Sequence, residues 1–487
     1  MNVKLLAGGL LAFVALAGAC ALPSHLPSQT SLDERRLTSF ENRIDELRTQ
    51  LRIPGMSAVI LKNQEVVWAK GFGYADYENR VPATPDTVYH VASITKPIAA
   101  TLIMQLVEQG KLDLDEPMSH YSSDFKDDSV RIKHLLSHTS GGTVPGERYE
   151  YSGSRYDHLT AVIEKKTGKS FREVMVQTIL DPLAMSSSVP GPKALDEADQ
   201  WVAVLGREHL DRYAKNLARQ SQPYTLYGDS EIVHVPYPPK FFGAAAGLLS
   251  TVMDLAKFDA AIDRHVLLRK ETQEKAWTPF VSNSGQRLPY ALGWFSVDYQ
   301  GIRLIWHGGN WGTGFSAIYV KVPEKNLSLI MLSNSEALNG HLYALYEGSE
   351  DITHDAFACA FLRQFVFEET RDLDCERNSQ IAVEKWRAER RELASAVVQV
   401  DPHSLEDYVG QYQFEFDPSM ILHVTTEGGK LFVDVPADRE TEVFASSPST
   451  FFFKIRPAQM TFIKDGGQVT GLDWAEHGET LRANKIK

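Results

Sequence analysis

The sequence predicts an α+β domain followed by a small all-β domain. In residues 41–375, β-branched segments occur early and late with helical segments between them, a pattern typical of one sheet whose ends meet around an inserted helical region. After a charged helical linker at 376–403, residues 404–487 contain short strands that glycine turns separate. A chain of 487 residues with 43% hydrophobic residues also exceeds what one core normally serves.

The composition excludes several classes of protein. Charged residues make up 23% of the chain and aromatic residues 10%, the balance of a globular protein rather than a disordered, collagen-like or coiled-coil one. Lys and Arg number 50 against 63 Asp and Glu, which gives a net charge of −13, and no run of basic residues occurs. We therefore expect no nucleic-acid partner.

The chain begins with the pattern of an export signal. Lys4 precedes an apolar run from Leu5 to Ala19 that is too short to span a membrane. Cleavage by an ordinary signal peptidase would remove residues 1–19. Because Cys20 directly follows small residues, the site is also similar to a bacterial lipoprotein box, and lipidation of Cys20 is the favoured interpretation. Residues 20–40 would then be a tether, and the exported protein would contact the cell-envelope membrane only through that lipid.

The first structured segments are a helix from about Ile44 and a β-hairpin. Residues 57–61 and 65–70 are rich in β-branched side chains and flank a three-residue turn. Further on, residues 97–107 are apolar on nearly every side, which predicts a buried helix. Proline is tolerated only in the first turn of a helix, so Pro97 requires this helix to begin at or near Ser93.

Later elements follow from caps and β-branched runs. Capping boxes at 170–173 and 251–254 predict two helix starts. Strands are expected at 317–320 and 327–332. The C-terminal domain is expected to contain strands at 410–414, 422–425, 430–433, 451–454, 460–463 and 469–472.

Ser93 and Lys96 are the first candidate catalytic residues. Positions i and i+3 of a helix share one face, so the Lys96 amine can reach the Ser93 hydroxyl. An amine held in a dry site can act as a base, and a serine at a helix N-terminus lies in a positive potential that suits a developing oxyanion. An N-cap serine beside a surface lysine is the alternative, and the buried helix that follows argues against it.

Two further segments fit an acyl-transfer site. Tyr151 stands on a tight loop before a helix expected near Tyr156, where its phenol could exchange a proton with Ser93 or Lys96. Residues 306–310 begin a late strand, and its glycines leave main-chain N–H groups available as oxyanion donors.

The order Ser-x-x-Lys, Tyr-Ser-x and His-x-Gly resembles the serine β-lactamase-like group, which holds class C β-lactamases, penicillin-binding proteins, D-aminopeptidases and esterases. The resemblance covers roughly residues 43–367 and extends to 87–97, 110–117, 134–142 and 247–251. It implies a β-lactamase/transpeptidase-like fold, an antiparallel sheet flanked by helices with an added helical region. The last part of the chain is similar to small β-barrel modules that follow such domains.

Carried over to this sequence, the resemblance implies that Ser93 is the acylated nucleophile and that Lys96 and Tyr151 shuttle its proton. The main-chain N–H groups of Ser93 and Asn310 would form the oxyanion hole. His307 and Gly309 would line the pocket beside them, and no cofactor or metal is implied.

The chain departs from the lactam-recognising members at two positions. Gly153 stands where those enzymes carry an asparagine that contacts the substrate's amide. His307 stands where they carry a lysine, so a permanent positive charge is replaced by a mostly neutral group. We therefore expect an exported serine hydrolase that acts on a small ester, amide or peptide. A true β-lactamase or DD-peptidase and a non-catalytic envelope binding protein are the alternatives.

Each of three further features of the sequence has two possible interpretations. Cys359 and Cys375 could form a disulfide in an oxidising compartment or remain two buried thiols. His134 and His138 are four residues apart, but without a third ligand they are better explained as structural than as zinc ligands. The aromatic and proline-rich segment 223–239 suits either a substrate-shaping lid or ordinary loop packing.

Overall fold

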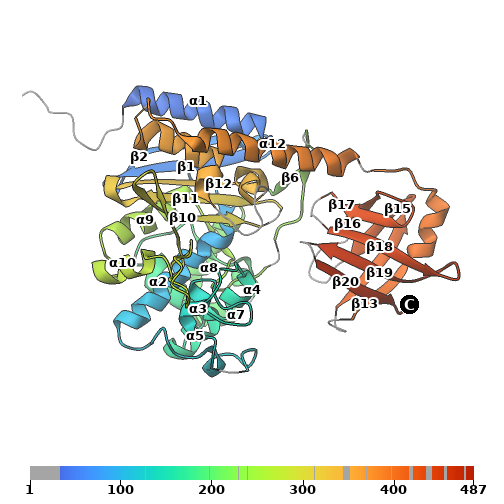
Figure 1. Ribbon diagram of the computed structural model, residues 1–487, viewed down its shortest axis with the longest axis horizontal. Helices are drawn as coiled ribbons and strands as arrows, with labels where there is room; N and C mark the ends of the chain where they lie inside the picture. The colour runs from blue at the N-terminus through green and yellow to red at the C-terminus, as the bar shows by residue number, and fades with distance from the viewer. Residues whose placement is uncertain are drawn as a thin grey trace, which may run out of the picture.

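The computed structural model consists of an α+β domain and a separate β-barrel (Figure 1). It describes residues 33–126, 128–196, 198–228, 230–238, 240–311, 313–343, 351–368, 370–395, 397–415, 420–434, 441–454, 458–476 and 479–487. The expected signal peptide, Cys20 and residues 20–32 of the expected tether lie outside these residues. Among the described helices, none has the length and apolar character needed to cross a membrane.

One antiparallel seven-stranded sheet unites the early and late strands, as the sequence predicts. Met56 to Lys62 of the first strand pair with Ser333 to Leu327 of the last one. In sheet order the strands are β3 (Val81–Pro82), β2 (Glu65–Asp76), β1 (Gly55–Lys62), β12 (Leu327–Ser333), β11 (Ser316–Val322), β10 (Ile302–Asn310) and β9 (Phe295–Tyr299).

The sheet separates two hydrophobic cores because side chains of a strand alternate between its faces. Ala58 and Ile60 of β1 belong to one core, whereas Val59 and Leu61 belong to the other. The second face is covered by α2 (Thr95–Glu108), α9 (Val252–Asp263), α10 (Lys270–Trp277) and a helical region (Figure 1). That region contains α3 (Ile132–Leu136), α4 (Gly153–Asp157), α5 (Leu159–Thr167), α6 (Phe171–Met175), α7 (Ala198–Leu205) and α8 (Arg207–Leu217).

Short strands complete this domain. They are β4 (Tyr89–His90), β8 (Leu248–Ser250) and β5 (Val189–Pro190) in one small sheet, and the hairpin of β6 (Tyr224–Tyr227) and β7 (Glu231–His234). The hairpin falls within the segment 223–239.

The first helix begins earlier than the sequence suggested. Helix α1 (Glu34–Gln50) starts at Glu34 rather than near Ile44, so residues 34–40 of the expected tether are helical. Its N-cap Asp33 accepts a hydrogen bond from the main-chain N–H of Arg35, at 2.8 Å. Phe40, four residues before Ile44, extends the buried stripe by one turn.

The expected linker is also part of the α+β domain. Helix α12 (Asp374–Ser395) lies beside α1 and α11 (Ala356–Phe361) over one face of the sheet and then leads to the barrel (Figure 1). Cys375, Ala382, Val383 and Trp386 are buried at helical spacing, while the charged side chains lie outside. The many Glu and Arg residues hide this stripe in the sequence.

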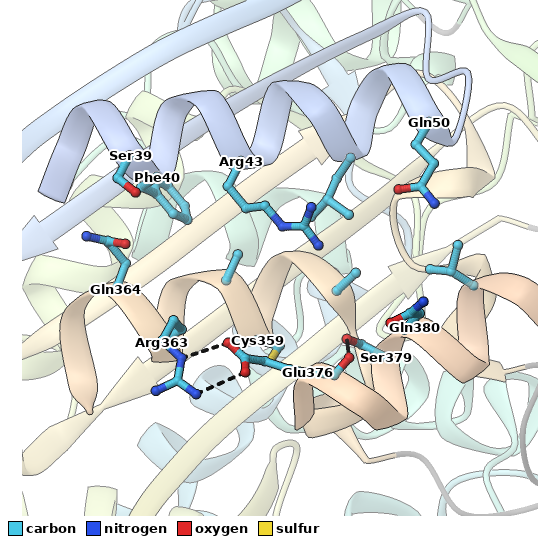
Figure 2. A pocket seen from close by; sticks show the side chains of 14 residues that line it. Ser39, Phe40, Arg43, Gln50, Cys359, Arg363, Gln364, Glu376, Ser379 and Gln380 are labelled. Atoms are coloured by element: carbon cyan, nitrogen blue, oxygen red, sulfur yellow. Dashed lines mark hydrogen bonds and ion pairs between the residues drawn. The ribbon is translucent and has the colours of Figure 1, made fainter. Parts of the chain in front are cut away.

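Cys359 of α11 and Cys375 of α12 form a disulfide with an S–S distance of 2.02 Å. The same two helices and α1 enclose a groove, in which the Arg363 guanidinium donates to both Glu376 carboxylate oxygens, at 2.7 and 3.0 Å (Figure 2). Helix α12 is therefore held to the domain by a covalent bond and by an ion pair near its N-terminus.

The C-terminal domain is a closed eight-stranded barrel. Its strands are β13 (Gly410–Phe414), β14 (Ile421–Glu427), β15 (Lys430–Asp434), β16 (Thr441–Ala445), β17 (Thr450–Phe453), β18 (Ala458–Asp465), β19 (Gln468–Glu476) and β20 (Glu479–Lys485). Six were expected, whereas β16 and β20 were missed. Phe451 and Phe453 of β17 lie in the barrel core.

Candidate active site

Ser93 lies in a strained turn at the start of the buried helix α2. The turn η1 (Ala92–Ile94) follows β4 and leads directly into α2. Ala92 has φ +48°, a left-handed conformation that costs a non-glycine residue on the order of 1–3 kcal/mol. Its N–H donates to His90 Nδ1 at 3.1 Å. The main-chain N–H of Ser93 lies in the first turn, where helical N–H groups lack a partner within the helix.

Lys96 reaches Ser93 as the i, i+3 spacing predicts. Its Nζ donates to Ser93 Oγ at 2.9 Å and to the main-chain oxygen of Ala245 at 3.0 Å. Only 1% of Lys96 is exposed, whereas Ser93 is partly exposed. The amine lies 4.9 Å from the ring centre of Tyr151 and 5.6 Å from that of Tyr156. A buried amine is thus in hydrogen-bond contact with an accessible hydroxyl.

Tyr151 is held by the loop that carries His138. The two rings stack with their centres 4.2 Å apart. His138 Nδ1 accepts a hydrogen bond from the N–H of Ser152, which in turn caps α4. Burial, and then the nearby Lys96 and His307, hold the pKa of His138 well below its usual value. A neutral imidazole therefore supports the tyrosine ring, a role that the sequence did not reveal because the contact joins two separate loops.

The end of β10 approaches Ser93 closely because residue 309 is a glycine. A Cβ atom on Gly309 would lie 2.4 Å from the main-chain oxygen of Val91 and 3.3 Å from the main-chain nitrogen of Ser93. Any larger residue would push the strand away from the turn. Asn310, the next residue, therefore lies beside the turn that carries Ser93.

His307 is buried within the site and both its ring nitrogens are engaged. Nδ1 lies 2.6 Å from the main-chain oxygen of Gly308, which can only accept, so Nδ1 carries the proton. Nε2 then accepts from the hydroxyl of Tyr290, at 2.8 Å. Burial and the charge of Lys96 lower the pKa of His307 to about 3, although the bond to Gly308 opposes this shift. The ring is therefore neutral at physiological pH.

The position of Gly153 leaves open space. A Cβ atom there would have no neighbour within 4 Å. A longer side chain would thus have room at the start of α4, two residues after Tyr151. The chain simply lacks the amide that lactam-recognising enzymes carry at this place.

The two histidines considered as zinc ligands have different surroundings. His134 Nδ1 accepts from the main-chain N–H of Arg131, and burial lowers the pKa of His134 to about 4. In the described part of the chain, no three His, Cys, Asp or Glu side chains gather as a metal site would require. The zinc interpretation gains no third ligand there.

Three segments thus meet at one place: the start of α2 with Ser93 and Lys96, the loop before α4 with Tyr151, and β10 with His307 and Gly309. This arrangement together with the fold defines a class of protein, the serine hydrolases with a β-lactamase/transpeptidase-like fold. The chain belongs to the beta-lactamase family, whose model matches residues 40–347, more than half of its length. A second model, a domain of unknown function (DUF3471), matches residues 394–485 and so covers the barrel.

Known proteins with similar sequences or structures agree with this family. The chain is 23% identical to a penicillin-binding protein of Bacillus subtilis, over 82% of this chain and 87% of that protein. An octameric penicillin-binding protein homologue from Pyrococcus abyssi matches 92% of this chain and 100% of its own, with a TM-score of 0.58 and 21% identity. A D-amino acid amidase from Ochrobactrum anthropi matches 62% of this chain and 91% of its own, with a TM-score of 0.51 and 21% identity.

Proposed function

We propose that the protein hydrolyses a small ester, amide or peptide through an acyl-enzyme on Ser93. The contact of 2.9 Å between the buried Lys96 amine and Ser93 Oγ carries this proposal. The pairing of a nucleophile with an adjacent base is the arrangement that covalent hydrolases need, because a neutral hydroxyl is a weak nucleophile.

In the proposed mechanism, Ser93 Oγ attacks the substrate carbonyl carbon while its proton passes to the pair of Lys96 and Tyr151. The N–H groups of Ser93 and Asn310 stabilise the oxyanion of the tetrahedral intermediate. Collapse of the intermediate expels the alcohol or amine, which takes the proton back. Water then attacks the acyl-enzyme and gives its proton to the same pair, which returns the proton to Ser93 Oγ as the ester bond breaks and the acid product leaves.

Two residues near the nucleophile, His307 and Gly153, differ from those expected in lactam-recognising enzymes and so narrow the class of substrate. His307 is neutral and has both nitrogens engaged, so it provides no fixed charge for a substrate carboxylate. Gly153 provides no amide. Both observations favour a neutral ester or amide over a penicillin as the substrate. The similarity to a D-amino acid amidase supports an amide. A true β-lactamase or DD-peptidase is the second candidate, because the relatives include a penicillin-binding protein.

Replacement of Ser93 tests the mechanism. In Ser93→Ala we expect kcat/KM for p-nitrophenyl butyrate to fall by about a thousandfold or more, together with loss of fluorophosphonate labelling. Ser284→Ala, at an exposed position, is the matched control and should retain both. Persistent turnover and labelling in Ser93→Ala would refute the acyl-enzyme. Absence of turnover by the unmodified protein on esters, D-amino acid amides and a chromogenic cephalosporin would favour the non-catalytic binding protein.

We further propose that the protein is exported, with Cys20 lipidated. The disulfide between Cys359 and Cys375 supports an oxidising compartment, where such bonds persist. Cys20→Ala should move the protein from the membrane fraction to the soluble fraction of the envelope, and mass spectrometry should show a lipid on the unmodified chain only. A membrane-free unmodified protein that begins at Cys20 would instead indicate ordinary signal cleavage.

A further inference from the structure

A buried carboxylate joins the helix that leads to the barrel to the segment after β12. Glu336 begins the turn η6 (Glu336–Leu338), and its side chain is 3% exposed. Its Oε1 accepts hydrogen bonds from Thr225 Oγ at 2.8 Å and from the N–H of Leu226 at 3.3 Å, both in β6. Arg390 of α12 forms an ion pair with the same oxygen at 2.7 Å. Three segments that are far apart in sequence therefore meet at one side chain.

The segment that carries Glu336 also holds the end of β10. The side-chain amide of Asn310 donates to Asn339 Oδ1 at 2.9 Å and to the main-chain oxygen of Glu336 at 3.5 Å. Asn339 is fully buried and donates to the main-chain oxygens of Gly309 and Ala317, at 3.1 and 2.9 Å. A displacement of residues 336–339 would therefore displace the main chain at Gly309 and Asn310.

Helix α12 contacts this segment at a second point. Trp386 lies one turn before Arg390, and the Arg390 guanidinium lies 4.8 Å from the centre of its ring. A Cβ atom on Gly340 would lie 2.9 Å from Trp386 Nε1, so the indole packs directly on the main chain there. The helix thus holds the segment on both sides of Asn339.

We propose that Arg390 and Glu336 are positioning residues for the oxyanion side of the active site. The inference rests on the proposed function, in which the N–H of Asn310 stabilises the oxyanion. Such a donor acts fully only when it is aimed at the place that the oxygen occupies in the transition state. Removal of Arg390 takes away the cation paired with a buried carboxylate and so allows the Glu336 segment, and with it Asn310, to shift.

Arg390→Met tests this role with two readouts. We expect kcat for p-nitrophenyl butyrate to fall about tenfold with little change in KM, because the lost stabilisation belongs to the transition state. The affinity for phenylboronic acid, whose adduct with a serine mimics the tetrahedral intermediate, should fall by a similar factor. Arg390→Lys retains a positive charge but not the paired contacts of a guanidinium, so it should recover part of both losses.

Arg363→Met is the matched control, because it removes an ion pair to Glu376 at the opposite end of α12 from Arg390 and should leave both readouts unchanged (Figure 2). The double variant Arg390→Met with Glu336→Gln lacks the unpaired buried charge. It replaces the single variant if that one does not fold, and it should show the same two losses.

Equal behaviour of the Arg390 and Arg363 variants would overturn the positioning role, as would a loss of kcat without weaker boronate binding. The Ser93→Ala protein separates this failure from failure of the proposed function. If Ser93→Ala retains turnover and boronate binding, both proposals fail. If it loses both properties while Arg390→Met does not, only the positioning role is wrong.

Discussion

At the scale of single residues, burial decides the charge of the groups around Ser93. His90 and His307 are each 1% exposed, and burial lowers the pKa of both to about 3. Burial lowers the pKa of His307 most and the nearby Lys96 lowers it further, whereas the hydrogen bond to the main-chain oxygen of Gly308 opposes the shift. At the position where the family resemblance implies a lysine in lactam-recognising enzymes, this chain therefore has a hydrogen-bonded neutral ring.

Because the pKa of both histidines is lowered, we expect acid to destabilise the fold. Their pKa lies below the unfolded value of 6.5, so the unfolded chain binds more protons as the pH falls. Protonation of these two histidines in the unfolded chain should therefore not lower the free energy of unfolding above pH 6.5. Between pH 6.5 and about pH 3, each buried neutral histidine should lower it by about 1.4 kcal/mol per pH unit. Urea unfolding at pH 6.5, 5.5 and 4.5 measures the slope. His90→Gln should reduce this slope, whereas His265→Asn, at an exposed position, should not. Equal slopes in the two variants would contradict the role given to His90.

At the scale of elements, the sequence predicts those structures that residues close together in the chain determine. The β1–β2 hairpin, the start of the buried helix near Ser93 and the caps of two helices are all confirmed. The contact between Lys96 and Ser93 also follows from helical spacing alone. The buried stripe of α12, the strands β16 and β20 and the stacking of His138 on Tyr151 depend on partners distant in sequence, so no local pattern reveals them.

The cap of α9 offers a test at this scale. Thr251 is fully buried, and its hydroxyl accepts a hydrogen bond from the N–H of Asp254 at 3.1 Å. Thr251→Val keeps the shape and removes the acceptor, so it should lower the free energy of unfolding by about 1 kcal/mol. Thr251→Ser retains the oxygen and should lose less. Denaturant unfolding compares the two, and an equal loss in both variants would mean that packing, not capping, sets the stability of this helix start.

At the scale of the whole molecule, the barrel contacts the α+β domain through the β6–β7 hairpin. The Tyr227 ring lies 6.4 Å from that of Phe444 in β16, and Lys454 Nζ is 4.0 Å from the centres of both rings. The residues that flank the hairpin pack on the loop after Asn310, because a Cβ atom on Gly314 would lie 2.7 Å from Pro223 and 3.3 Å from Val235. The segment 223–239 therefore links the barrel to the loop after Asn310.

Two truncations separate the roles of α12 and the barrel. A chain that ends at Ser395 keeps α12, its disulfide and Arg390, so it should fold and retain its kcat on small esters. If the barrel shapes the pocket entrance through the hairpin, KM should rise for larger substrates only, since only remote binding is lost.

A chain that ends at Glu368 lacks α12 and exposes the apolar core that Val383 and Trp386 cover, so we expect insoluble protein. Unchanged kinetics on every substrate for the longer chain would remove the gating role, and a soluble, active shorter chain would show that α12 is dispensable for the domain.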